Sequence, residues 1–464
     1  MVFSSLIFLW IFLPVVLIGS FVLPGKAKNV FLLIASLLFY TWGEPKYIIL
    51  MLISIGVNWI MGLLMDRYAT PKKFILIIDI VFNLLLLGYF KYFNFVIDIV
   101  NGFIENKIEI KEIALPIGIS FFTFQILSYM IDLYRGKYKA QKSIINLALY
   151  ISFFPQLIAG PIVRYEDINE QLENRHCTIE KTADGVRRFL YGLAKKVIIA
   201  NSVAYTVDQI YALEDFQVTG TLAWVGAIFY TLQIYYDFSG YSDMAIGLGK
   251  MFGFEFLENF NYPYMSRSVQ EFWQRWHMSL GTWFREYVYI PLGGNRKGVI
   301  RTNLNVLIVF FLTGLWHGAS FNFILWGVYY GVLQIIEKIG FRKFLDKHII
   351  FSHIYIILTF VFGWVLFRAE DLKQAGSMIV RMLMPWKYTD KLIAWQQVLN
   401  HRTFLIAVFG VVGIGIIQNI VKKSRGIANL KNSYLELIFC AGLFFACIMM
   451  LASNTYNPFI YFRF

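Results

Sequence analysis

Apolar runs long enough to cross a lipid bilayer recur along this chain. They cover residues 5–23, 29–44, 47–65, 74–99, 115–133, 144–162, 220–242, 302–318, 321–338, 350–367, 403–421 and 434–452. A hydrocarbon core about 30 Å thick needs about 20 helical residues, and most of these runs meet or approach that length. The runs do not alternate apolar and polar residues, as strands of a membrane barrel would. The pattern predicts an all-α polytopic membrane protein with about twelve transmembrane helices in a single domain over residues 1–464.

The region from residue 185 to residue 300 departs from this pattern. Segment 186–212 mixes arginines and lysines with apolar residues at helical spacing, and segment 266–291 mixes tryptophan, arginine, glutamate and histidine. Polar backbone or side chains at membrane depth need protein or water around them. We therefore expect interfacial or re-entrant amphipathic helices here, with 220–242 as the crossing helix of this region.

Composition and charge support the membrane class. Hydrophobic residues make up 58% of the sequence and charged residues 15%, whereas soluble proteins have roughly 45–50% and about 25%. The net charge of +13 comes mostly from loops, so it indicates membrane topology, and we expect no nucleic-acid binding. The three cysteines, Cys177, Cys440 and Cys447, are too few and too scattered for a disulfide framework or a metal site.

Loop charges predict the orientation, because lysine and arginine favour the cytoplasmic side of short loops. The basic loops lie around residues 26–28, 67–73, 135–142, 296–301, 342–347 and 422–425. The loops at 100–113 and 164–184 are more acidic and are expected outside. Both termini are then outside, and segment 434–464 comprises a transmembrane helix followed by an extracellular tail.

His317 lies at the end of the apolar run 307–318. Ionisable residues within membrane segments are functional candidates, because an apolar environment disfavours them. The alternative is a neutral imidazole that hydrogen-bonds to a neighbouring helix. Gly314 and Gly318 flank the ring and would let a substrate or another helix approach closely.

Two polar segments accompany this histidine. Asp237 and Asp243 lie at the end of the run 220–242, six residues apart, and do not share a helical face, so they do not indicate a paired-carboxylate catalyst. A polar wall or the orientation of a histidine is the expected role.

In segment 271–294, a continuous helix would place Trp273, Trp276 and His277 on one side, and would place Arg275 and Ser279 on a shared face. Such a strip could bind a phosphate or line a polar channel. An interfacial helix whose tryptophans and tyrosines mark the headgroup level is the alternative.

A metal site is not expected. His277 and His317 have no third or fourth ligand at suitable spacing, and a catalytic zinc needs three protein ligands. The sequence also lacks a nucleophile elbow, a glycine-rich phosphate loop and a His-Glu-x-x-His motif.

Five segments together resemble one family. They are AGPIVR at 159–164, YDFSGYSD at 236–243, FWQRWHMS at 272–279, YIPLGGNR at 289–296 and GLWHG at 314–318. In this order they resemble the membrane-bound O-acyltransferases, in the bacterial branch that acetylates alginate and peptidoglycan. The resemblance extends from the start of the chain to about residue 380. It implies an all-helical fold around a central funnel or tunnel, in the cytoplasmic membrane of a bacterial cell.

The resemblance also implies roles for particular residues. His317 matches the active-site histidine of the family, and His277 matches its second histidine motif. Asp237, Arg275, Trp276, Ser279, Trp316 and Asn295 would bind the acyl donor or line the tunnel. A base is needed to take a proton from a hydroxyl group during acyl transfer, and a desolvated histidine stays neutral and able to accept it.

The last residues, NPFIYFRF at 457–464, resemble the terminal motif of a small membrane peptide that accompanies the teichoic acid D-alanylation branch of the family. By that resemblance Tyr461 would accept the acyl group at His317. A phenol with a pKa of about 10 is a weak nucleophile, so a neighbouring base would be required. The alternative is an aromatic anchor at the membrane interface.

The expected function is transfer of an acetyl group from cytoplasmic acetyl-CoA, with no bound cofactor, to an extracellular polysaccharide. The resemblance implies an extracytoplasmic SGNH-type partner that completes the transfer. D-alanyl transfer to teichoic acid is an alternative, and a non-catalytic transporter or scaffold for glycan modification is another. A transporter would show duplicated halves with paired broken helices, which the sequence lacks. A scaffold would not need His317.

Overall fold

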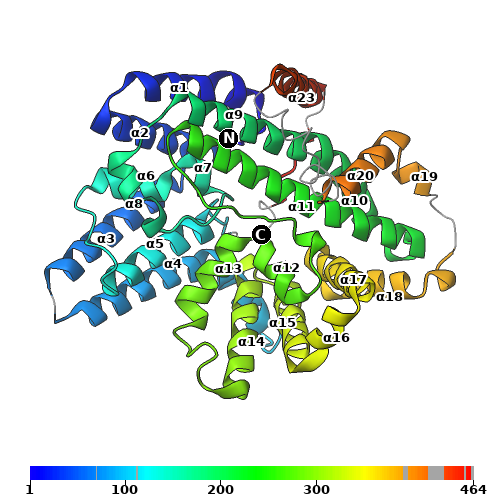
Figure 1. Cartoon of the computed structure of the whole chain (residues 1–464). Helices are drawn as coiled ribbons and strands as arrows, with labels where there is room; N and C mark the ends of the chain where they lie inside the picture. Colours follow the sequence, from blue (N-terminus) through cyan, green and yellow to red (C-terminus); the bar gives the residue numbers. More distant parts are fainter. Residues whose placement is uncertain (69, 111–112, 390–394, 416–432, 454–455, 461–464) are drawn as a thin grey trace. The chain divides into compact units, whose positions relative to one another are not determined.

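The described part of the chain is helical throughout. The computed structural model describes residues 1–464 except 69, 111–112, 390–394, 416–432, 454–455 and 461–464. Within these described residues, α-helices are joined by short 3-10 and π turns, and no strand is present (Figure 1). The predicted all-α class is therefore confirmed. Contacts divide the chain into two compact units, unit 1 with Met1–Phe189 and Ser242–Glu258, and unit 2 with Leu190–Tyr241 and Asn259–Phe464.

Unit 1 contains the first helices of the chain. They are α1 (Leu13–Val22), α2 (Gly25–Gly43), α3 (Ile48–Arg67), α4 (Lys72–Asn101), α5 (Ile119–Tyr134), α6 (Ile144–Ser152), α7 (Phe154–Leu157), α8 (Tyr165–Asn174) and most of α9 (Ile179–Ala194). A cluster of rings from Phe3, Phe8, Phe39 and Phe154, with centroids 5.1–6.4 Å apart, joins the start of the chain to α2 and α7. Aromatic rings supply large apolar areas, so this cluster forms a core for unit 1.

Unit 2 contains the helices of the second half of the chain. They are α10 (Asn201–Tyr211), the larger part of α11 (Gly220–Met251), α12 (Val269–Arg275), α13 (Met278–Phe284), α14 (Gly298–His317), α15 (Phe321–Ile336), α16 (Arg342–Lys347), α17 (Ile349–Arg368), α18 (Leu372–Leu383), α19 (Trp395–Val398), α20 (His401–Gly413) and α23 (Tyr434–Ser453). A π turn, η2 (Lys195–Ala200), joins α9 to α10. The largest fully buried side chains of the core of unit 2 include Trp326, Trp364, Tyr230 and Tyr330.

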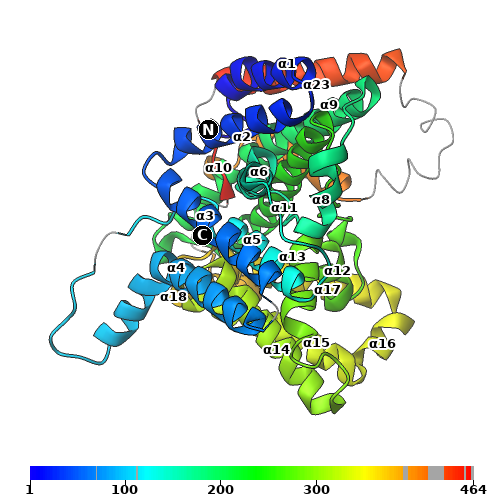
Figure 2. The same cartoon turned by 90° about the vertical axis from the view of Figure 1, so that its left-hand side faces the viewer.

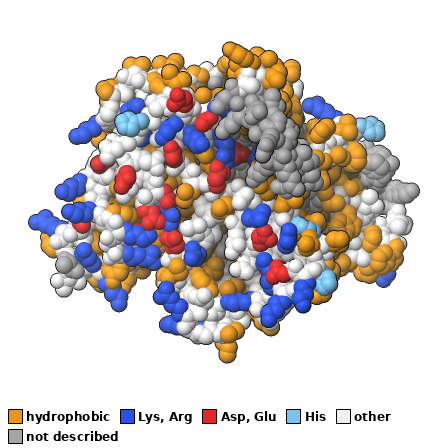
Figure 3. All heavy atoms as spheres, in the orientation of Figure 1, with side chains coloured by type: hydrophobic (Ala, Val, Ile, Leu, Met, Phe, Trp, Pro, Cys, Tyr) orange, Lys and Arg blue, Asp and Glu red, His pale blue; other side chains and the backbone are white. Residues whose placement is uncertain are grey.

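Five described helices are long and apolar enough to cross a bilayer: α3, α4, α14, α17 and α23. The apolar helices around α1, α5 and α20 are shorter. Large apolar side chains face outward, among them Ile18, Phe409 and Leu437, which are 65%, 70% and 67% exposed, and Figure 3 shows broad apolar areas on one face. Such a surface suits lipid rather than water. The count of twelve crossings and the central tunnel stay predictions.

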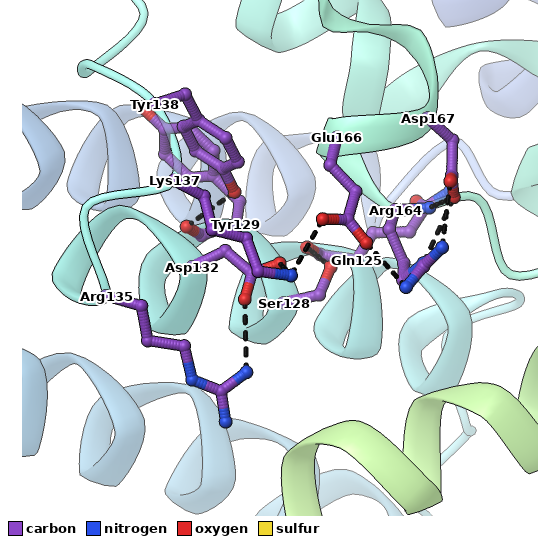
Figure 4. A network of polar contacts seen from close by, with 10 residues as sticks. All are labelled: Gln125, Ser128, Tyr129, Asp132, Arg135, Lys137, Tyr138, Arg164, Glu166 and Asp167. Carbon is purple, nitrogen blue, oxygen red and sulfur yellow. Dashed lines mark hydrogen bonds and ion pairs between the residues drawn. The ribbon is translucent and has the colours of Figure 1, made fainter.

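A network of charged side chains connects the loop after α5 with the start of α8 (Figure 4). The carboxylate of Asp132 is 1% exposed and pairs with Lys137 at 3.2 Å, and Lys137 also pairs with Glu166 at 2.7 Å. Arg164 pairs with Glu166 and with Asp167, the latter at 2.9 Å. The two loops therefore contact each other directly.

This network bears on the predicted crossing at 144–162, which is not one continuous helix. The segment forms a helix of nine residues, α6, about 14 Å long, followed by the separate short helix α7. The loops at 135–142 and 164–184 were expected on opposite sides of the membrane, yet Lys137 and Glu166 lie 2.7 Å apart. The acidic residues at the start of the second loop are partners of cations, so their charge does not indicate an extracellular position. We therefore expect segment 144–162 to re-enter, and its path through a membrane stays a prediction.

Candidate active site

His317 is the last residue of α14 and is buried among aromatic rings. Its ring lies edge-on to Trp316, Trp326 and Phe367, with centroids 4.9, 5.2 and 5.1 Å away. α14 positions the histidine because it packs tightly against α15, which lies beside it in Figures 1 and 2. A Cβ at Gly314 would lie 2.2 Å from the carbonyl oxygen of Phe323, so the close approach requires glycine. Gly314, one of the two glycines that flank His317, therefore allows α15 to approach α14 closely.

A small cavity lies beside the imidazole. It is lined by Ile234, Phe238, Trp276, His317, Trp326, Trp364, Phe367 and Ile460. Its volume is about 10 Å³, roughly the space that one water molecule needs. The lining is almost entirely apolar, so a charged group that forms here would depend on the few polar atoms present. Ile460 brings the last described residue of the chain into this cavity.

His277 does not lie on a continuous helix, which corrects the strip predicted over segment 271–294. α12 ends at Arg275, Trp276 is extended with ψ 128°, and His277 has φ 46° in the left-handed region before α13 begins. The main chain of residues 259–261 runs alongside the break. The Asn261 N–H donates to the Arg275 carbonyl, and the Met278 N–H donates to the Asn259 carbonyl, each at 2.9 Å. These bonds replace those that would continue the helix.

The side chain of Asn259 orients His277. Asn259 Oδ1 accepts from the Ser279 N–H at 3.2 Å and from the Ser279 hydroxyl at 2.9 Å, and it lies 3.1 Å from His277 Nδ1. Because the main-chain N–H can only donate, the atom facing it is the amide oxygen, and a bond from the imidazole to that oxygen places the proton on Nδ1. Nε2 then carries the lone pair, and no described residue offers it a hydrogen bond. Burial lowers the pKa of His277 to about 3, so the ring is neutral.

Trp316 is in ring contact with both histidines. Its ring centroid is 4.9 Å from that of His317 and 6.0 Å from that of His277, and Phe238 lies 4.6 Å from His277. The structure thus brings together the predicted residues His317, Trp316, Trp276, His277 and Ser279.

Asp237 faces the end of the chain rather than a histidine. Its carboxylate pairs with Lys196 at 2.7 Å, and its Oδ2 accepts the Ile460 N–H at 2.9 Å. Lys196 also donates to the carbonyl of Pro458. Asp243, in contrast, pairs with Arg188. The two aspartates of α11 thus have separate partners.

Two other predicted residues lie apart from the cavity. Arg275 pairs with Glu271 one turn earlier on α12 at 2.7 Å, and its side chain is 33% exposed. Asn295 is exposed in the turn before α14. Tyr461 lies outside the described residues. Among the described residues, no group of three or more histidine, cysteine and acidic side chains is arranged to hold a metal ion.

The sequence reasoning missed several residues of the site. The sequence contains one indication of Lys196: an apolar stretch follows this lysine, so its charge needs a buried partner. Asn259 lies in a loop without a recognisable motif, and Ile460 was not distinguished from its aromatic neighbours. Trp326, Trp364 and Phe367 were ordinary members of apolar runs. The pairing of these residues depends on contacts between distant parts of the chain, which periodicity does not report.

Comparison with known proteins agrees with the predicted family. The family model of the membrane-bound O-acyltransferases matches residues 139–373. The chain is 39% identical over 490 residues to a protein of Pseudomonas putida named probable alginate O-acetylase AlgI, with 100% of both chains covered. It is 34% identical to the peptidoglycan O-acetyltransferase of Helicobacter pylori, covering 82% of this chain and 80% of the relative.

A more distant relative comes from another branch. The teichoic acid D-alanyltransferase of Bacillus subtilis is 30% identical over 276 residues, which cover 55% of this chain and 69% of that protein. The full-length similarity, the family match and the multi-pass helical structure agree with one another. This chain belongs to the membrane-bound O-acyltransferase family and is an acyltransferase enzyme of the membrane.

Proposed function

We propose that this enzyme O-acetylates an extracellular or cell-wall polysaccharide. The proposal is supported by relatives named alginate O-acetylase and peptidoglycan O-acetyltransferase, which match 100% and 82% of this chain. Acetyl-CoA on the cytoplasmic side is the proposed donor, and an extracytoplasmic SGNH-type protein is the proposed partner that passes the acetyl group to the glycan. D-alanyl transfer is the second candidate. It is favoured by the terminal motif and by the more distant relative, but that similarity covers about half of this chain.

The proposed mechanism uses His317 as the general base and Tyr461 as the transient acyl acceptor. One observation carries it: Ile460, the residue before Tyr461, lines the same cavity as His317. Tyr461 is the next residue in the sequence after Ile460, which is why its phenol is the proposed acyl acceptor. A nucleophile and a base that meet in an apolar site are the parts that acyl transfer requires.

Each step can be written with its protons. The imidazole of His317 takes the proton of the Tyr461 hydroxyl, and the phenolate oxygen attacks the thioester carbonyl of the donor. The carbon–sulfur bond breaks, and the leaving thiolate takes the proton from the imidazolium, which returns the histidine to its neutral form. A hydroxyl of the partner then attacks the aryl ester, the bond between the acyl carbon and the phenolic oxygen breaks, and the proton of that hydroxyl passes to the released phenolate. Aryl esters are reactive because the phenolate is a good leaving group.

The surrounding residues have proposed supporting roles. Trp276 and Trp316 exclude water around the histidine, and His277 with Ser279 forms a second polar position beside Trp316. Arg275 and Asn295 lie closer to solvent and would meet the donor before it enters the tunnel. Exclusion of water protects the thioester and the tyrosyl ester from hydrolysis.

Mass spectrometry of the C-terminal peptide after incubation with acetyl-CoA tests the proposal. The wild type should carry one acetyl group on Tyr461, and the His317→Ala variant should carry none. Transfer by His317→Ala should fall by about 10²- to 10⁴-fold, the usual contribution of a general base. An alanyl group on Tyr461 after incubation with a D-alanyl donor, with no acetylation from acetyl-CoA, would favour the second candidate.

Two tyrosine variants give the matched comparison. Tyr461→Phe should lose both the acyl group and the activity. Tyr434→Phe, at a position that is 87% exposed in α23, should still be acylated at Tyr461, because Tyr434 does not line the cavity. Full activity of Tyr461→Phe would rule out the relay, and full activity of His317→Ala would rule out the base.

A further inference from the structure

Residues 456–460 are held by a row of side chains of unit 2. The Asn201 amide donates to Asn457 Oδ1 at 3.0 Å, and the ring of Phe459 stacks on Tyr241 with centroids 4.6 Å apart. Ile460, at the end of this row, is 3% exposed. We call residues 456–460 the tail. Successive tail residues thus have defined partners on η2, α10 and α11, although the tail lacks regular secondary structure over most of its length.

The central contact of this row is a buried ion pair. Lys196 and Asp237 lie 2.7 Å apart, and their side chains are 3% and 2% exposed. Burial of two charges is costly unless further hydrogen bonds occupy their remaining donors and acceptors. Here the tail supplies those bonds, because the ammonium donates to the Pro458 carbonyl and the carboxylate accepts the Ile460 N–H.

The two charges recognise main-chain groups. A carbonyl at residue 458 and an N–H at residue 460 are present whatever the side chains, and Pro458 has no N–H of its own that would need a partner. The side-chain contribution comes from Phe459, whose ring lies on Tyr241 and 5.8 Å from the Lys196 ammonium. The ligand of this site is therefore a polypeptide segment with an aromatic residue between the two main-chain contacts.

The π-helical segment η2 and the glycine at residue 240 bring Lys196 and Asp237 together. Lys196 lies in the π turn η2, and such turns redirect side chains within a helix. A Cβ at Gly240 would lie 2.8 Å from the carbonyl oxygen of Gly192 and 3.2 Å from the main-chain nitrogen of Lys196. The absence of a side chain at residue 240 thus lets α11 approach η2, which places Asp237 within reach of Lys196.

We infer that Lys196 and Asp237 form a peptide-binding clamp that docks the tail of this chain and holds Ile460 at the cavity that His317 lines. That Tyr461, the next residue in the sequence, receives the acyl group rests on the proposed function, whereas the docking itself does not. Because the tail supplies hydrogen bonds that the buried pair needs, the docked tail is the favoured state of this site.

Hydrogen exchange of the C-terminal peptide, read by mass spectrometry on the full-length protein, tests the clamp. In Lys196→Asp combined with Asp237→Lys, an ion pair remains possible but its donor and acceptor are exchanged. A carboxylate at position 196 cannot donate to the Pro458 carbonyl, and an ammonium at position 237 cannot accept the Ile460 N–H. Exchange in the tail should become faster by about tenfold, because hydrogen bonds to charged groups are lost.

Substitution within the tail gives a test that leaves the clamp residues in place. Ile460→Pro removes the N–H that Asp237 accepts, whereas Ile460→Ala keeps it while shortening the side chain. Exchange at residues 456–459 should rise more in the proline variant. As a control, Arg381→Met removes another buried cation of unit 2, whose partners are Asp215, Ser377 and Val218, and should leave exchange in the tail unchanged.

The outcomes separate the clamp from the relay. Wild-type exchange of the tail in both the swapped-pair and the proline variants would overturn the clamp, and acylation of Tyr461 would still be open to its own test. Faster exchange in these variants together with full activity of Tyr461→Phe would support docking and reject the relay. If the swapped pair raised exchange in peptides of α14 and α15 as well, the protein would be misfolded, and the proline and alanine comparison would decide.

Discussion

His277 shows how a single residue can combine strain, burial and orientation. Its φ of 46° is uncommon for a residue with a side chain, and such a conformation costs about 1–2 kcal/mol. The conformation produces the turn between α12 and α13 and directs the imidazole toward Asn259. Strained residues of this kind persist where the surrounding contacts specify them, and they gather at functional sites. We therefore retain His277 as a candidate for catalysis.

The depressed pKa of His277 leads to a prediction about acid stability. The folded protein holds this pKa at about 3, below the ordinary value of 6.5, so between these values the unfolded chain binds a proton that the folded chain excludes. The free energy of unfolding should therefore fall as the pH decreases below 6.5. His277→Gln removes this contribution. The slope of its free energy of unfolding against pH should therefore be smaller than that of the wild type, by up to about 1.4 kcal/mol per pH unit.

Thermal unfolding in detergent between pH 7 and pH 4.5 measures this difference. His348→Gln, at an exposed position, is the control for loss of an imidazole. Parallel pH dependence of the wild type and His277→Gln would show that the folded protein accepts the proton at this site as readily as the unfolded chain.

At the scale of elements, the contact between α14 and α15 determines where His317 stands. The two helices meet at Gly314 and Gly327, whose added Cβ atoms would lie 2.2 and 2.3 Å from the carbonyl oxygens of Phe323 and Phe310. Close approach of this kind depends on small residues, because main-chain packing is a large part of the association between membrane helices. His317 is one helical turn from this contact.

Substitution at the contact should therefore cost both stability and activity. Gly314→Ala should destabilise the protein by about 1–3 kcal/mol, because the helices must separate to admit the methyl group. Gly442→Ala in α23 is the matched control, since a Cβ there has no neighbour within 4 Å, and it should be neutral or stabilise by up to about 1 kcal/mol. Thermal unfolding and acetyl transfer should be measured on both variants. Equal effects of the two substitutions would mean that the glycine contact does not determine the position of α14.

At the scale of the whole molecule, re-entry of segment 144–162 would change the predicted topology. The basic loops 135–142 and 296–301 were both predicted in the cytoplasm, and the sequence placed two crossings between them, at 144–162 and 220–242. Two points on one side of a membrane are separated by an even number of crossings. If 144–162 does not cross and both loops are cytoplasmic, 220–242 does not cross either. Helix α11, which contains the second run, is not among the described helices that are long and apolar enough to span.

Cysteine labelling with a membrane-impermeant maleimide tests this topology. Lys139→Cys, Glu170→Cys and Lys297→Cys are all at exposed positions and should react only when the cytoplasmic side is accessible. Glu105→Cys, in the loop after α4, should react from outside. Reaction of Glu170→Cys from outside would contradict the inference that segment 144–162 re-enters.

Much of the helical structure was predictable from local pattern, and its interruptions were not. The runs at 47–65, 74–99, 302–318 and 350–367 correspond to the observed helices α3, α4, α14 and α17. The break in segment 266–291 arises because the main chain of residues 259–261 competes for its hydrogen bonds. The competing groups belong to a loop outside the segment. They therefore leave no periodic signal in the segment that they interrupt.

The sequence by itself determined the membrane class, most helical runs, the family and the choice of His317 as a candidate residue, because each depends on local composition or on a short motif. The tertiary structure decided which buried polar groups meet: Asn259 with His277, and Lys196 with Asp237 and the tail. A buried polar atom requires a partner, but any of several distant residues could supply it. Only the folded chain selects the partner, because selection depends on contacts between residues as far apart as Asp237 and Ile460.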